Sequence, residues 1–92
     1  MMIKDLLERR RAKIDALVLA ALTLRHPSGA SSHQLQRTTD LSYVRLFSAL
    51  GRLEHQKLII RLWEPGWGGA RGSFWYRLTD AAFEKIATTK TS

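Results

Sequence analysis

The stretch from Ser42 to Ile60, SYVRLFSALGRLEHQKLII, carries the pattern that decides the fold of this chain. Three leucines recur at the spacing that places side chains on one face of an α-helix: Leu46, Leu50 and Leu53. We expect the opposite side to carry two arginines, an amide and a small residue: Arg45, Ala49, Arg52 and Gln56. Such a helix can pack on a core and read a DNA major groove with its outer side. An ordinary surface helix has the same pattern, so this helix alone leaves both interpretations open.

Two β-prone runs follow this helix and predict a hairpin. They are Leu58–Glu64 and the aromatic-rich Ser73–Leu78, and the segment between them, Pro65–Gly72, is rich in glycine. Glycine adopts positive φ angles at little cost and keeps the tip of such a loop flexible. A helix followed by a basic hairpin is the layout of a winged helix-turn-helix, in which the helix enters the major groove and the hairpin lies on the neighbouring backbone.

The whole chain fits one winged-helix domain over residues 1–92. Ninety-two residues with a hydrophobic content of 45% are enough for one modest core. We expect an α+β fold, mainly α, in four parts: a long first helix at 1–25, a helix-turn-helix at 31–57, a two-stranded wing at 58–78 and a short C-terminal helix at 79–88.

Small polar residues and a proline mark the ends of these helices. The turn His26–Gly29 ends the first helix, because proline cannot continue it. Ser31 or Ser32 caps the second helix, since a side-chain hydroxyl can accept a free amide hydrogen bond there. The caps expected for the later helices are Asp40 or Ser42, and then Thr79.

Two segments resemble the PadR-like transcriptional regulators. Leu41–Glu54 is similar to the family's helix in its serine, its Ala-Leu and its Arg-Leu-Glu, and Ser73–Ala82 resembles the Tyr-Arg-Leu-Thr-Glu run where the second wing strand meets the next helix. The resemblance spans about Leu17 to Ile86, and the MarR-like regulators share parts of it. It implies a winged helix-turn-helix that binds DNA as a dimeric transcriptional regulator.

Several positions depart from the family's pattern. Phe47 stands where tyrosine is usual, and Ala82 stands where glycine is usual. Ser32–Leu35 replaces the family's Gly-Tyr-Glu-Leu on the preceding helix. PadR-like proteins usually dimerise through a long C-terminal helix, whereas this chain stops at Ser92 and leaves only a short one.

The charge of the chain favours a polyanionic partner. Lys and Arg number 15 against 8 Asp and Glu, which gives a formal net charge of +7. Such an excess suits nucleic acid, although a solvated basic surface would give the same count. The arginine-rich run Arg9–Arg11 with Lys13 does not form one patch on a helix, because consecutive residues point in different directions. A solvated helix is favoured there over a second backbone contact or a docking surface.

Several function classes are disfavoured. The longest apolar run, Ala16–Leu22, is too short to span a bilayer, and charges interrupt any signal peptide, so we expect a cytoplasmic, nucleoid-associated protein with no membrane partner. The chain has no cysteine, and its three histidines have no metal-ligand spacing. With no phosphate loop or nucleophile motif either, we expect no metal, no cofactor and no enzyme activity.

The candidate DNA contacts are basic and hydroxyl side chains on the helix-turn-helix and the wing. An arginine fork can hold guanine O6 and N7 together or grip a phosphate. The candidates are Arg37 near the end of the second helix, Ser42, Tyr43, Arg45, Ser48 and Arg52 on the third, and Arg61, Arg71 and Arg77 on the wing. Alternatives remain open for several of them. Arg45 or Arg52 is solvated or pairs with Glu54, and Arg61 or Arg77 pairs with Glu64. Arg71 belongs to a disordered loop, and Tyr43 is partly buried.

The three tryptophans allow two interpretations. Trp63 and Trp75 lie in the expected strands, where aromatic residues pack across a hairpin, and Trp67 lies in the glycine-rich loop. Packing on the hairpin is the favoured role. The resemblance adds a second one, because some PadR-like regulators bind flat hydrophobic molecules between aromatic side chains at the dimer interface, and Trp63 or Trp75 could hold such a small effector.

A homodimer is expected because one winged helix offers few base contacts. Two copies related by a twofold axis read a palindromic operator, with half-sites about 34 Å apart. The candidate dimerisation residues are Ile3, Leu6 and Leu7 on the first helix, with Phe83 and Ile86 on the last. The function expected is sequence-specific binding of double-stranded DNA as a repressor. A protein-interaction module and an architectural or partition DNA-binding protein are the alternatives.

Overall fold

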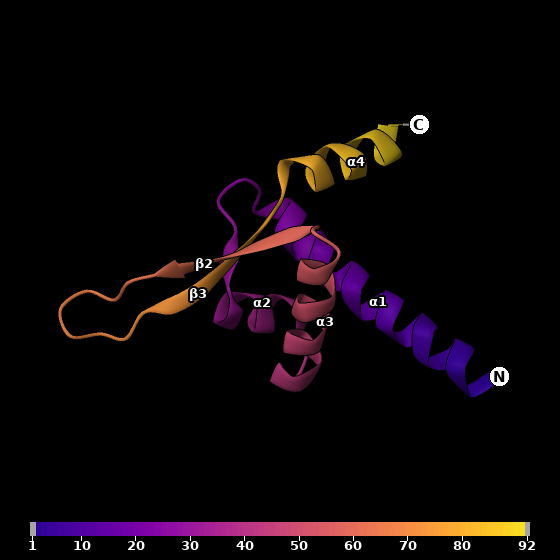
Figure 1. The fold of residues 1–92 in the computed structure, drawn as a ribbon, viewed down its shortest axis with the longest axis horizontal. Helices are drawn as coiled ribbons and strands as arrows, with labels where there is room; N and C mark the ends of the chain where they lie inside the picture. The colour runs from indigo at the N-terminus through magenta and orange to yellow at the C-terminus, as the bar shows by residue number, and fades with distance from the viewer. Residues whose placement is uncertain (1, 92) are drawn as a thin grey trace.

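The computed structural model describes residues 2–91, and it describes the side chains of residues 3–88. The elements are α1 (Met2–Leu24), β1 (Ala30–Ser31), α2 (Ser32–Thr39), α3 (Tyr43–His55), β2 (Ile59–Glu64), β3 (Ser73–Leu78) and α4 (Asp80–Thr91). Four helices and a small antiparallel sheet make a winged helix-turn-helix, with the hairpin β2–β3 as the wing (Figure 1). The predicted fold class is confirmed, and α4 runs beyond its predicted end near residue 88.

The core forms where the apolar sides of α1, α2 and α3 meet the root of the wing. The predicted leucines of α3 are all buried, together with residues from every neighbouring element. The largest fully buried side chains are Val18, Leu22, Leu35, Leu46, Leu50, Leu53, Ile59 and Leu78. Burial of each leucine or isoleucine contributes about 1.5–3 kcal/mol, so this one cluster sets how α3 lies on the body.

A three-stranded sheet in the order β1-β3-β2 joins the wing to the body. Tyr76 in β3 pairs with Ala30 in β1 on one side and with Arg61 in β2 on the other. Gly29 precedes β1 with a φ of 84°, and a Cβ there would overlap the Tyr76 carbonyl oxygen. Only glycine fits this close approach, which keeps the root of the wing fixed against the body.

The caps of the helix-turn-helix follow the sequence signals and resolve the open alternatives. Ser31 caps α2 in a capping box with Gln34, in which each side chain bonds the other's backbone amide. Asp40 ends α2 in the left-handed region at a φ of 58°. Ser42 caps α3 by accepting a hydrogen bond of 3.3 Å from the Arg45 amide. Thr79 likewise accepts from the Ala82 amide at the start of α4.

The two terminal helices project from the body on different sides (Figure 1). The 23 residues of α1 span about 35 Å, and its side chains are exposed from residue 3 to residue 13, before Ile14 meets the core. The first turns of α4 lie on the body, where the Phe83 ring stacks on His26 with centroids 4.1 Å apart. Among residues 2–91, no helix combines the length and the apolar character needed to cross a membrane.

Candidate nucleic-acid interface

The outer side of α3 differs from the one expected from the sequence. Ala49, expected there, is fully buried, because it lies beside the leucines rather than opposite them. The residues that face away from the core follow helical spacing: Val44, Ser48, Gly51 and His55. Val44 is 79% exposed, and nothing lies within 4 Å of a Cβ built on Gly51. The same periodicity that located the core leucines could have found this side, half a turn away from them.

Arg52 is held by the protein itself. Its guanidinium donates to Asp15 of α1, with Nη2 2.7 Å from Oδ1 and Nε 3.2 Å from both carboxylate oxygens. The two side chains are only 29% and 16% exposed. Glu54, the partner considered for Arg52 from the sequence, instead lies 3.9 Å from Nε of Arg61. Arg52 therefore ties α3 to α1, and it is not among the DNA contacts that we propose.

The start of α3 contacts α2 through a pair of polar side chains. The Tyr43 hydroxyl lies 3.3 Å from Nδ1 of His33 in α2, and the Tyr43 ring stacks on Phe47 at 5.9 Å. Tyr43 is nevertheless exposed, as are Arg45 and Ser48. The exposed start of α3 thus presents aromatic, hydroxyl and cationic groups on a rigid support, which suits contacts to a phosphate backbone or to base edges.

The wing carries an aromatic cluster near its middle and cations along its length. Trp63 meets Phe74 edge to face at 5.0 Å, and the Arg61 guanidinium lies 4.8 Å from the Phe74 ring centre. Gly72 lies beside Trp63, where any Cβ would overlap the indole ring. Arg71 is exposed in the loop at the far end of the hairpin (Figure 1). The loop therefore offers a cation on a glycine-rich backbone, as expected from the sequence.

The base of the wing is anchored to the body of the domain by a side-chain hydrogen bond and by burial. Trp75 donates from Nε1 to the Ser28 carbonyl at 2.7 Å, which anchors β3 beside the turn after α1. Burial raises the pKa of the Tyr76 phenol above its ordinary value of 10.0, while the nearby Arg61 lowers it in part. Arg77 is half-buried, and its Nε has no hydrogen-bond partner among the described residues. An effector site at Trp63 or Trp75 stays a prediction.

The remaining candidates fall at separate places. Arg37 is exposed on α2 and lines a hollow of about 400 Å³ together with Arg25, Gln34 and Thr38. Of the expected dimerisation residues, Ile3, Leu6 and Leu7 are exposed on α1. Phe83 and Ile86 instead pack against the core of their own chain. The sequence reasoning missed two further exposed leucines of α1, Leu17 and Leu24.

Comparisons with known proteins agree with this geometry. No protein-family model and no curated protein matches the chain. A PadR-like transcription factor from Bacteroides fragilis has a TM-score of 0.75 at 16% identity, over 99% of this chain and 87% of that chain. A PadR family transcriptional regulator from Eggerthella lenta has a TM-score of 0.68 at 25% identity, over 98% of this chain and 80% of that chain.

A third solved structure is similar over nearly its whole length. It is a predicted DNA-binding transcriptional regulator from E. coli, with a TM-score of 0.60 and 24% identity over 98% of this chain and 95% of that chain. The chain therefore has the winged helix-turn-helix fold of PadR-like regulators, and the expected resemblance to this family is confirmed.

Proposed function

We propose that this chain is a DNA-binding transcriptional regulator that reads a specific double-stranded sequence as a homodimer. The observation that carries the proposal is the outer side of α3, which is exposed along its length and has the exposed Arg45 beside it. The PadR-like fold supports it, because the similar solved structures are described as transcription regulators. The protein would act in the cytoplasm at the nucleoid, and occlusion of a promoter would make it a repressor.

In this proposal the outer side of α3 enters the major groove. The Val44 side chain offers two methyl groups for contact with a thymine methyl, and Ser48 offers a hydroxyl to either kind of base pair. Ser42 and Tyr43 would lie against phosphates at the helix start, where free amides also favour anions. Gly51 lets the backbone of α3 approach the groove wall closely.

The wing and α2 would supply contacts to the backbone on either side of that groove. Arg71, exposed in the loop shortly before β3, is placed for a minor groove or its phosphates, since the glycines of the loop allow the backbone to adapt. Arg61 and Arg77 on the strands and Arg37 on α2 are further phosphate candidates. Such contacts position a protein on DNA and supply most of the salt dependence of its affinity.

The exposed apolar side chains of α1 support the proposal that two copies of the chain form a homodimer. Leu6, Leu17 and Leu24 share one side of the helix by their spacing, and Ile3 lies beside them. Leu24 is 85% exposed, and apolar stripes of this kind mark interaction surfaces. A twofold axis at α1 would present two α3 helices to a palindrome.

Selection from a random duplex library tests the proposal, with light scattering of the same sample for its mass. An enriched inverted repeat bound by a dimer, with affinity falling steeply as salt rises, is the expected result. Tight binding with no enriched sequence would replace the regulator with an architectural protein. Absence of binding at low salt would contradict DNA binding altogether and favour a protein-interaction module.

A further inference from the structure

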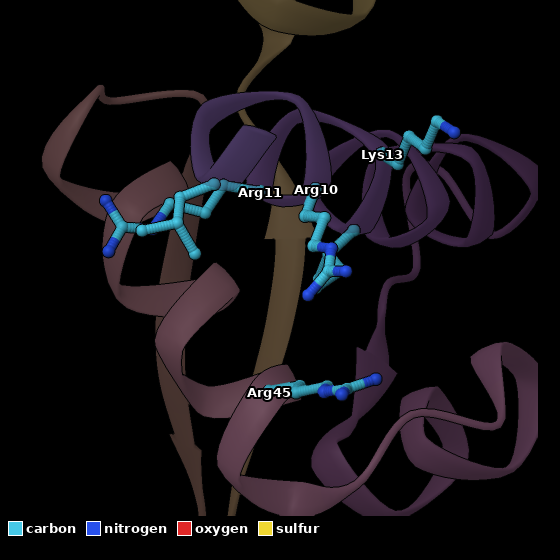
Figure 2. A pocket seen from close by; sticks show the side chains of 6 residues that line it. Arg10, Arg11, Lys13 and Arg45 are labelled. Carbon is cyan, nitrogen blue, oxygen red and sulfur yellow. The ribbon is translucent and has the colours of Figure 1, made fainter. Parts of the chain in front are cut away.

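A basic hollow lies between the projecting half of α1 and the start of α3. Its volume is about 590 Å³, and its lining residues are Leu7, Arg10, Arg11, Lys13, Ile14 and Arg45. Arg10 points from α1 toward α3, and Arg45 of α3 extends beneath it (Figure 2). The hollow is thus lined from two helices that are far apart in sequence, and Leu7 and Ile14 supply the apolar part of its lining.

The charge of this hollow is unbalanced. Four of its six lining residues are cations, and none is acidic. Within residues 3–88, none of the four cations forms an ion pair with a carboxylate. Figure 2 shows Arg10 extending toward Arg45, whereas the charged ends of Arg11 and Lys13 point to other sides. An anion between α1 and α3 is therefore attracted by Arg10 and Arg45 at short range, and by the other two cations at longer range.

The Arg52–Asp15 pair joins the two helices that line the hollow. Asp15 follows Ile14 directly on α1, and its carboxylate is taken up by Arg52 rather than by a cation of the hollow. The pair therefore holds α1 and α3 together and leaves the cations of the hollow without a carboxylate partner. Arg9, the third arginine of the run, does not line the hollow.

We propose that this hollow binds phosphodiester groups of the same DNA duplex that α3 reads, on the strand that borders the groove. The inference rests on the proposed DNA-binding function. Arginine guanidinium groups match phosphate oxygens with paired hydrogen bonds, and Arg45 stands at the boundary between the hollow and the exposed start of α3. The proposal assigns Arg45 to the backbone rather than to a base, and it extends the DNA interface onto α1.

A matched pair of double variants tests the inference on a duplex that the wild type binds. Arg10→Gln/Arg11→Gln removes two cations of the hollow, and Lys4→Gln/Arg9→Gln removes two cations from the same helix outside it. All four side chains are exposed, so both variants should fold, which circular dichroism checks. Affinity is measured by fluorescence anisotropy over a salt series on the specific duplex and on a scrambled one.

The hollow variant is expected to lose affinity for both duplexes by the same factor. The slope of log affinity against log salt should become shallower by about 1–2, because each lost phosphate contact removes about one unit and Arg10 extends toward Arg45. The control variant should keep a slope near that of the wild type. Methylphosphonate groups placed one by one along the duplex should weaken the wild type at one or two flanking positions and leave the hollow variant unchanged there.

The outcomes separate the inference from the proposed function. If the wild type binds DNA and Arg10→Gln/Arg11→Gln keeps its affinity and slope, the hollow is not a phosphate site while the regulator proposal stands. Equal losses in the two double variants would also overturn the inference, because the effect would then come from net charge alone. If the wild type binds no duplex, the proposed function fails, and the inference fails with it.

Discussion

Arg52 of α3 and Asp15 of α1 form a bidentate ion pair that links the two helices. Both guanidinium nitrogens Nε and Nη2 reach the carboxylate, and the shortest contact is 2.7 Å. The partly buried position makes this pair stronger than a surface salt bridge, since solvent screens it less. The pair sets the angle at which α3 is presented, so we treat Arg52 as a positioning residue.

Loss of either partner should therefore act on stability and on DNA binding together. Arg52→Ala and Asp15→Ala are each expected to lower the free energy of unfolding by about 1–3 kcal/mol, because hydrogen bonds to charged groups have this magnitude. A double-mutant cycle in urea should give a coupling energy between them.

The effect of Asp15→Ala on DNA binding distinguishes positioning from direct contact. If Arg52 only positions α3, the variant weakens binding, although it makes the protein more positive. If Arg52 contacts DNA itself, release from Asp15 should tighten binding in an anisotropy titration, and our assignment of Arg52 would be wrong.

Val44→Ala tests the groove-facing side of α3. Val44 is exposed, so its truncation should leave the free energy of unfolding nearly unchanged. We expect a loss of about 1–3 kcal/mol in discrimination at one base pair, read by repeating the duplex selection with the variant. Val44→Thr keeps one methyl group and serves as the intermediate control. An enriched sequence identical to that of the wild type at every position would remove Val44 from the readout.

Arg71→Ala tests the wing. The expected result is an equal loss of affinity for specific and scrambled duplexes, with a salt slope shallower by about 1, because a phosphate contact carries no sequence information. Lys4→Ala removes the same charge from the exposed start of α1 and should have little effect. A loss confined to the specific duplex would instead indicate that Arg71 reads a base edge.

Two glycine substitutions should change stability in opposite directions. Gly29→Ala places a Cβ against the Tyr76 carbonyl at a φ of 84°, and we expect a loss of about 1–3 kcal/mol. Gly51→Ala introduces a Cβ into open space within α3, and alanine stabilises a helix by about 0.5–1 kcal/mol relative to glycine. Urea titrations of both variants measure the difference. Similar stability for the two would contradict the close packing at the root of the wing.

Local sequence patterns predicted the helices and strands, but they did not predict contacts between residues that are far apart in the sequence. Helical spacing located the buried leucines of α3, and the glycine-rich loop between β-prone runs located the wing. Nothing in the local sequence pairs Arg52 with Asp15, which lies 37 residues away. The basic hollow likewise requires the packing of α1 on α3, because neither helix alone places Arg10 beside Arg45.

The exposed side of α3 is encoded in the helical spacing, yet the sequence-based prediction placed it wrongly. The side that carries Arg45 and Ala49 lies next to the leucines rather than opposite them, which is why Ala49 is buried. The expected outer side was the one with the positively charged residues, whereas Val44 and His55 lie on the exposed side of the helix. Counting every position around the helix, rather than the charged ones alone, puts Val44 and His55 opposite the leucines.

The measurement that tests the central claim most directly is the ratio of affinities for a selected duplex and its scrambled counterpart, at salt from about 50 to 200 mM. A sequence-specific regulator should keep a ratio of about a thousandfold or more at physiological salt, while both affinities fall as salt rises. A ratio near one throughout would contradict the claim that the outer side of α3 reads DNA sequence.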